Sequence, residues 1–226
     1  MIPLRDNILH KRMPIISVGL IILNFMVFIY EKMQVDYLRE FLFKWGLVPL
    51  KILSSDFTLF EKIIPFITSI FLHGSWFHLI SNCWFIWIFA DNVEDRLGHF
   101  NFLMFFILCG IGANISHLIM NLNSPLPAVG ASGAISGVLG AYFILFPFSR
   151  ILTLIPFFIF WEIVEIPAFI YLGMWFLLQF LNGIAFSHQT MFYGGVAWWA
   201  HIGGFLTGIF LLNFFLKSNK KRRQRL

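Results

Sequence analysis

Charged residues are scarce in this chain of 226 residues. Asp, Glu, Lys and Arg together make up 12% of the sequence, against about one quarter in soluble domains, and hydrophobic residues make up 59%. This shortage excludes an ordinary soluble domain and predicts a membrane protein. Acidic residues are the scarcest class, 11 against 16 basic ones, and each of them lies outside the long apolar stretches or at their ends.

Cysteine is also rare, since the chain holds only Cys83 and Cys109, both in apolar stretches. Two such residues without metal-ligand spacing are interpreted as small buried side chains. The zinc-protease motif H-E-x-x-H is absent, and no acid lies near the histidines His73, His78 and His201. We therefore expect neither a metal nor a cofactor.

A basic tail, residues 217–226, closes the chain without any recognisable nucleic-acid motif. Next to an apolar stretch, such a tail is typical of the cytoplasmic side of a membrane and of anionic lipid head groups. Nucleic acid is therefore not expected as a partner, whereas the lipid bilayer is. The N-terminus is basic too, with Arg5, Lys11 and Arg12. We predict a multi-pass protein of the cell membrane with both termini in the cytoplasm, which requires an even number of spans.

Six apolar stretches approach the roughly 20 residues that a helix needs to cross a bilayer. They cover residues 14–30, 76–90, 100–120, 128–146, 167–181 and 196–216. These stretches predict an all-α fold, a polytopic bundle of six transmembrane helices in a single membrane domain over residues 1–226. The charged segment after the first stretch is predicted to be a long structured loop. Residues 151–161 are apolar but short and interrupted by Pro156, which predicts an interfacial or re-entrant segment.

Polar residues occur at one depth in three of the predicted spans. With the N-terminus inside, the second, fourth and sixth spans all run inward from the outer surface. At about 1.5 Å per residue, His78, Asn82, Ser132 and His201 then lie roughly 5 to 10 Å below that surface. Polar groups at this depth are costly, so the prediction is that they serve a function.

Glycine spacing suggests how two of these residues meet. His201 and Gly204 share one face of the sixth span, and Gly133 and Gly137 form a smooth face on the fourth. Faces of small residues let membrane helices approach closely. Such a contact would bring the imidazole of His201 to the hydroxyl of Ser132.

The residue types predict nucleophilic catalysis. A serine hydroxyl needs an adjacent base, and His201 can take its proton and later deliver it to a leaving amine. His78 and Asn82, spaced i and i+4, can both donate to an oxyanion. Because the spans contain no acid, we predict a Ser-His dyad; Asp56 or Glu61 of the first loop could supply a third member only by folding in.

Two alternatives keep the same membrane architecture. A polytopic transporter also places polar residues at depth, although it more often shows paired charges or repeats. A catalytically inactive binding protein of the same fold would lose the serine or the histidine, and both are retained here.

Three motifs in this order resemble the rhomboid family of intramembrane serine proteases. They are His73-x4-His78-x3-Asn82, Gly130-Ala131-Ser132-Gly133 and Ala200-His201-Ile202-Gly203-Gly204. The resemblance, to the six-span bacterial form, implies a serine endopeptidase with Ser132 as nucleophile and His201 as base. It also implies that His78 and Asn82 act on the oxyanion, supported by His73, Gly130, Gly133 and Gly204.

The resemblance carries further expectations. Substrates are expected to be single-span membrane proteins, cut near the outer face at small residues in an unstable helix segment. Some family members have an aromatic residue four positions after the nucleophile that stacks on the histidine, whereas this chain has Ser136. That support is expected to be missing or to come from elsewhere. Trp175, Phe176 and Phe180 of the fifth span are expected to flank a lateral opening.

Overall fold

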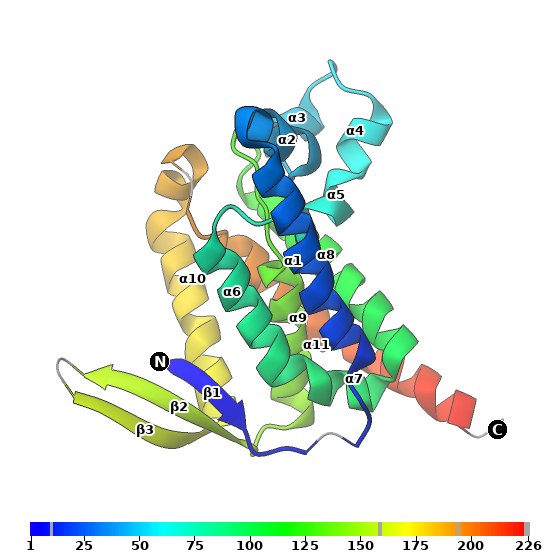
Figure 1. Cartoon of the computed structure of the whole chain (residues 1–226), viewed down its shortest axis with the longest axis vertical. Coiled ribbons are helices and arrows are strands. Elements are labelled where there is room, and N and C mark those ends of the chain that lie inside the picture. The colour runs from blue at the N-terminus through cyan, green and yellow to red at the C-terminus, as the bar shows by residue number, and fades with distance from the viewer. Residues whose placement is uncertain (10, 158–159, 194, 224–226) are drawn as a thin grey trace.

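The computed structural model describes residues 1–9, 11–157, 160–193 and 195–223 (Figure 1). The side chains of residues 35, 157, 160, 187–193 and 217–223 lie outside this description. The prediction for the basic side chains of the tail, residues 217–226, therefore falls outside the described part of the chain.

Four helices are long and apolar enough to cross a membrane by length and composition. They are α1 (Ile15–Met33), α8 (His99–Met120), residues Ala168–Phe186 of α10 (Ala168–Tyr193) and residues Trp198–Leu216 of α11 (Trp198–Arg223). A fifth candidate is the pair Leu59–Phe71 and Trp76–Leu97, bent by 75°. The chain is thus a mostly helical membrane protein with four or five candidate spans among the described residues. The count of six stays a prediction, because the apolar helix α9 (Ser132–Leu145) has only 14 residues.

The helix of the second predicted span is longer than expected. It consists of α6 (Trp76–Phe85), a π-helical turn η3 (Ile86–Ala90) and α7 (Asp91–Leu97), so it does not end at residue 90. Two of the polar residues that suggested an end, Asn92 and Glu94, are instead buried. Glu94 accepts hydrogen bonds from the backbone N–H and the hydroxyl of Ser17, at 2.8 and 2.6 Å. Satisfied polar groups allow the helix to continue inside the protein.

Short helices fill the segment between α1 and α6. In chain order they are η1 (Val35–Tyr37), α2 (Leu38–Trp45), α3 (Pro49–Leu53), α4 (Leu59–Ile63), α5 (Pro65–Thr68) and η2 (Ser69–Phe71). Thr58 and Glu61 form a reciprocal capping box at the start of α4, which explains why a helix begins in this polar stretch. The segment lies at one end of the bundle (Figure 1).

A small antiparallel sheet corrects the all-α prediction. Its strands are β1 (Ile2–Asp6), β2 (Arg150–Phe157) and β3 (Phe160–Pro167), in the order β1-β2-β3. Residues 151–157 and 160–161 therefore belong to the paired strands β2 and β3 and do not form a re-entrant segment. The stretch is rich in β-branched residues, and Thr153 pairs with Val164 in the ladder. Pro156 lies near the end of β2, where a missing N–H is most easily tolerated.

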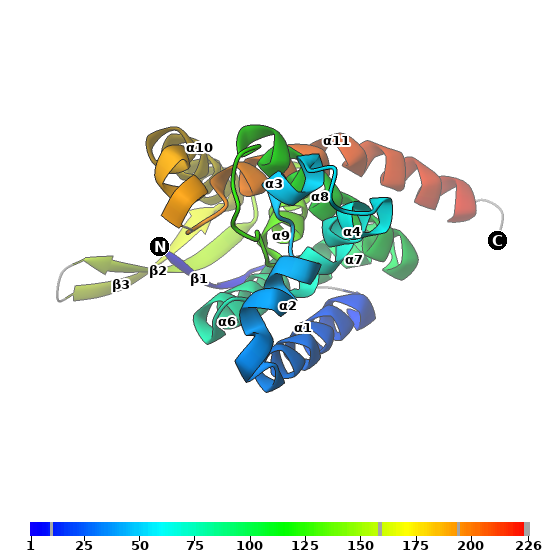
Figure 2. The ribbon, with the colours of Figure 1, turned by 90° about the horizontal axis from the view of Figure 1, so that it is seen from above.

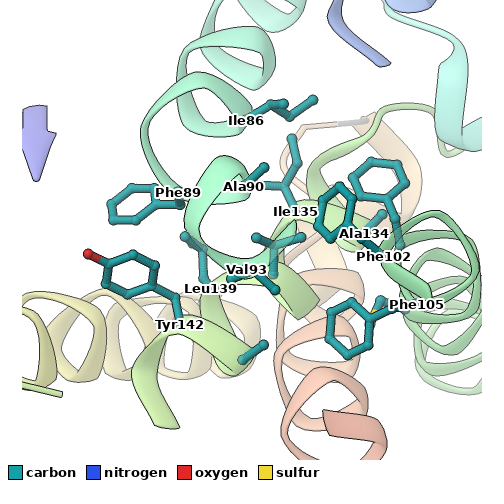
Figure 3. Close-up of a cluster of buried hydrophobic side chains, with 14 of the residues drawn as sticks. Ile86, Phe89, Ala90, Val93, Phe102, Phe105, Ala134, Ile135, Leu139 and Tyr142 are labelled. Atoms are coloured by element: carbon teal, nitrogen blue, oxygen red, sulfur yellow. The ribbon is translucent and has the colours of Figure 1, made fainter. Parts of the chain in front are cut away.

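Helix α9 lies in the middle of the bundle in both views (Figures 1 and 2). All of its residues from Gly133 to Tyr142 are buried. Figure 3 shows the core beside it, where side chains from the helix at 76–97, from α8 and from α9 meet. The labelled members include Phe89, Val93, Phe105, Ile135 and Leu139. This enclosure places the N-terminal end of α9 inside the protein.

Candidate active site

Ser132 and His201 face each other from the starts of two helices. Ser132 is the first residue of α9, and His201 lies in the first turn of α11. The Nε2 atom of His201 is 2.9 Å from the Oγ atom of Ser132, although the residues are 69 positions apart in sequence. This is the distance at which a histidine can take a proton from a hydroxyl.

Close backbone contact between α9 and α11 makes this distance possible. A methyl group at Gly204 would collide with the carbonyl oxygen of Gly133, and one at Gly208 with that of Gly137. The smooth faces noted in the sequence therefore lie directly against each other. Larger side chains at either glycine would move the imidazole away from the hydroxyl.

Gly130 shapes the turn that leads into Ser132. Its φ angle is +127°, a conformation that L side chains rarely adopt, and a methyl group there would lie 2.6 Å from the imidazole of His78. The backbone N–H of Gly130 donates to the carbonyl oxygen of Ser69 at 2.8 Å. The turn is therefore held close to His78, next to the start of α9.

One cavity of about 480 Å³ contains all four residues that the sequence singled out. Ser132, His201, His78 and Asn82 line it together. His117 lines the same cavity. So do several apolar side chains from three helices and a loop, among them Phe77, Ile135, Trp175 and Val196. The cavity thus combines a hydroxyl, imidazoles and an amide with an apolar wall, a composition typical of binding sites.

His73 lies outside the lining of this cavity and is 1% exposed. Its Nδ1 atom is 3.2 Å from the carbonyl oxygen of Phe71, and its Nε2 atom is 3.0 Å from Nδ2 of Asn82. Because a carbonyl oxygen only accepts, Nδ1 carries the proton and Nε2 accepts from the amide of Asn82. His73 therefore contacts the site through Asn82.

Glu31 is a residue near this arrangement that sequence reasoning missed. It is 1% exposed, and its carboxylate accepts the backbone N–H of His73 at 3.0 and 3.2 Å. In the sequence Glu31 follows an apolar stretch and begins a charged segment, so nothing marked it as buried. Its partner is 42 residues away and becomes apparent only in the folded chain.

Gln179 of α10 is a second residue that the sequence reading missed. Its Oε1 atom lies 2.8 Å from Nδ1 of His201, and its side chain is buried. Trp175, one turn earlier, places its ring 5.9 Å from the imidazole with an angle of 31° between the planes. The aromatic contact that Ser136 cannot make thus comes from another helix. Ser136 instead donates to the carbonyl oxygen of Ser132 at 2.6 Å.

Asp56 and Glu61, the acids considered as a third catalytic residue, lie in hydrogen-bonded turns outside the cavity lining. The carboxylate of Asp56 accepts from the hydroxyl of Ser54 at 3.0 Å, and that of Glu61 accepts from Thr58 at 2.7 Å. Within the described residues, no three His, Cys, Asp or Glu side chains group as metal ligands would. The groups gathered around Ser132 are those of acid–base and nucleophilic chemistry.

The chain is similar to proteins of one known family. A family model described as the rhomboid domain matches residues 61–218. The mitochondrial rhomboid protein 1 of Saccharomyces cerevisiae is 30% identical over 168 residues, which cover 72% of this chain and 44% of that protein. The rhomboid protein YdcA of Bacillus subtilis is 32% identical over 169 residues, which cover 70% of this chain and 69% of YdcA.

A chloroplastic rhomboid-like protein of Arabidopsis thaliana is also similar, with 31% identity over 68% of this chain and 52% of that protein. The chain spans about half the length of the first curated relatives that it matches. The family model, however, covers well over half of this chain and includes every residue of the cavity named above. The resemblance seen in the three motifs is confirmed, and the chain belongs to the rhomboid family.

Proposed function

We propose that this chain is a serine endopeptidase that cleaves membrane-embedded substrates, with Ser132 as nucleophile and His201 as general base. The observation that carries the proposal is the 2.9 Å contact between Oγ of Ser132 and Nε2 of His201 in a partly apolar cavity. Membership of a family of intramembrane proteases supports the same reaction class. A transporter would have no need for a hydroxyl and an imidazole at hydrogen-bonding distance.

The proposed reaction has two stages. In the first, Oγ of Ser132 attacks the scissile carbonyl carbon while Nε2 of His201 takes the hydroxyl proton. The same nitrogen then protonates the leaving amine, and an acyl-enzyme ester remains on Ser132. In the second stage, His201 takes a proton from water, the resulting hydroxide attacks the ester, and the proton returns to the oxygen of Ser132.

Oxyanion stabilisation is assigned to three kinds of donor. Asn82 has two amide hydrogens, and its bond to His73 uses one of them. The imidazole of His78 lies against the Gly130 turn that precedes the nucleophile. The amides of the first turn of α9 have no acceptor within the helix. Gly130, Gly133 and Gly204 support this arrangement by allowing close approach, and His73 supports it through Asn82.

The proposed topology has six spans, with α9 as the fourth and the helix of residues 76–97 as the second. All 226 residues then form one membrane domain with both termini in the cytoplasm and the cavity near the outer face. The strand β1 and the C-terminal end of α11 lie toward the same end of the bundle, which supports this choice (Figure 1). The proposed substrates are single-span membrane proteins, and the proposed location is the cell membrane.

The experiment that tests this proposal compares the purified protein with its Ser132→Ala and His201→Ala variants on a panel of single-span substrates in proteoliposomes. We expect cleavage by the wild type and loss of cleavage in both variants. Labelling by a fluorophosphonate should require Ser132. Ser136→Ala serves as the matched variant, one turn along the same helix, and should retain cleavage. Cleavage that survives Ser132→Ala but is lost in Ser136→Ala would contradict the assignment.

A further inference from the structure

Resting on the proposed function, we infer that Gln179 is a positioning residue that holds His201 in the one tautomer able to accept the proton of Ser132. The two ring nitrogens of His201 have different partners. Nε2 faces the hydroxyl of Ser132 at 2.9 Å, and Nδ1 faces Oε1 of Gln179 at 2.8 Å. Gln179 is 7% exposed, so water does not compete freely for its amide.

The tautomer follows from the hydrogen-bonding capacity of the amide oxygen. A neutral imidazole carries one proton, and the carbonyl oxygen of a glutamine only accepts. Oε1 of Gln179 therefore requires the proton on Nδ1. The lone pair of Nε2 is then directed at Ser132, as a general base requires. When His201 becomes positively charged during the reaction, the bond from Nδ1 to Gln179 becomes charge-assisted and stronger.

Helix α10 places the side chain of Gln179 against His201. Trp175, Gln179 and Gly183 are spaced four residues apart and share one face of the helix. A methyl group at Gly183 would lie 3.4 to 3.6 Å from side chains of Trp198, Trp199 and Ile202 on α11. Trp175, one turn before Gln179, places its ring 5.9 Å from the imidazole of His201. The whole face therefore packs on the first turns of α11, with its amide at the level of Nδ1.

A neutral amide suits this depth better than a carboxylate. A buried carboxylate pays a large desolvation penalty, and in a membrane span that penalty is greater than in a soluble enzyme. Gln179 supplies the acceptor for Nδ1 without introducing a charge. The imidazole of His201 can therefore be oriented although the apolar stretches 167–181 and 196–216 contain no Asp or Glu.

The variants Gln179→Leu and Gln179→Glu separate positioning from packing. Leucine keeps most of the volume and removes the acceptor, whereas glutamate keeps an acceptor oxygen. We expect Gln179→Leu to lower kcat by on the order of 10- to 100-fold with little change in KM, the effect of losing one buried hydrogen bond to the base. Gln179→Glu should recover part of that loss, because it returns an acceptor oxygen for Nδ1 although a carboxylate is costly at this depth. Asn182→Leu removes an amide from the same helix, away from the cavity lining, and is the matched control with unchanged kcat.

Nitrogen-15 NMR of histidine-labelled protein gives a readout that does not depend on substrate. Wild type should show His201 protonated at Nδ1, and Gln179→Leu should show increased protonation at Nε2 instead. The resonance is assigned by its loss in His201→Ala. This measurement also covers the case in which Gln179→Leu is too inactive for kinetics, because only folded protein gives the dispersed spectrum.

Three results would overturn the inference: wild-type kcat in Gln179→Leu, equal impairment in the leucine and glutamate variants, or an unchanged tautomer of His201. None of these affects the proposed function, which is judged separately by fluorophosphonate labelling of Ser132 in the wild-type protein. If wild-type protein is not labelled and does not cleave any substrate, the proposed function fails, while the tautomer measurement still decides the role of Gln179.

Discussion

The amide nitrogen of Asn82 lies 3.0 Å from Nε2 of His73, which fixes the amide plane of a residue on the wall of the cavity. Since Nδ1 of His73 bonds to the carbonyl oxygen of Phe71, the imidazole itself is held on both sides. One hydrogen of the Asn82 amide is thereby used, and the other is left for a ligand in the cavity. The i, i+4 spacing of His78 and Asn82 in the sequence predicts two donors, but the orientation of the Asn82 amide depends on His73.

Replacing Asn82 with alanine should impair turnover more than stability. Losing one oxyanion donor typically costs on the order of 100-fold or more in rate. The loss of the bond to His73 should cost about 1 kcal/mol of unfolding free energy. The measurements are kcat on a single-span substrate and thermal unfolding in detergent. Asn82 would be a packing residue if the variant unfolds while activity per folded molecule stays at the wild-type level.

Replacing His73 with phenylalanine should act through Asn82. Phenylalanine preserves a ring and removes the acceptor for the amide, so kcat should fall by on the order of 10-fold. The double variant with Asn82→Ala should be no slower than Asn82→Ala alone, because both changes remove the same positioned donor. Additive losses in this double-mutant cycle would show that His73 has an independent role.

Glu31 should stabilise the turn at His73. Glu31→Leu leaves the buried backbone N–H of His73 without an acceptor, which costs about 1 to 3 kcal/mol of unfolding free energy. Glu31→Gln retains an acceptor oxygen and should lose less. Chemical or thermal unfolding of the two variants side by side measures the difference. Equal stability of the leucine and glutamine variants would contradict a hydrogen-bonding role.

Gly204→Ala should separate α11 from α9. The added methyl group meets the carbonyl oxygen of Gly133, and overpacking of this kind costs about 1 to 3 kcal/mol. Cleavage and fluorophosphonate labelling should both fall, because the imidazole moves with the helix. Gly173→Ala on α10 is the control, since a methyl group there meets nothing within 4 Å. Wild-type labelling in Gly204→Ala would mean that the helices can shift without loss.

Reporter fusions test the topology. A reporter fused after Leu226 should score as cytoplasmic, and one inserted between residues 121 and 127 should score as external. The reason is the excess of basic residues at both ends of the chain. An external score at the C-terminus would remove the even number of spans, and with it the inference that His78, Ser132 and His201 enter the membrane from the same side.

Local patterns carried a large part of the prediction. Apolar stretches at residues 14–30, 100–120, 167–181 and 196–216 overlap α1, α8, α10 and α11, because a bilayer-crossing helix satisfies its own backbone and needs only local composition. The spacing of glycines marked the two faces that lie in contact around Gly133 and Gly204. Three short motifs identified the family.

Tertiary structure decided what depends on distant partners. Strand β1 pairs with β2 across most of the chain length, so its ladder left no sign in either local sequence. The re-entrant alternative for residues 151–161 was wrong for the described residues of β2 and β3. The helix continues beyond residue 90, where the buried carboxylate of Glu94 accepts a hydrogen bond from the hydroxyl of Ser17. Gln179 looked like one polar residue in an apolar helix, and Glu31 like the start of a loop. The amino-acid sequence was sufficient to predict the membrane class, most of the helices and the family. Only the folded structure shows which polar side chains orient His201 and Asn82. The reason is that a hydrogen bond needs an approach of about 3 Å, which no spacing along the chain encodes.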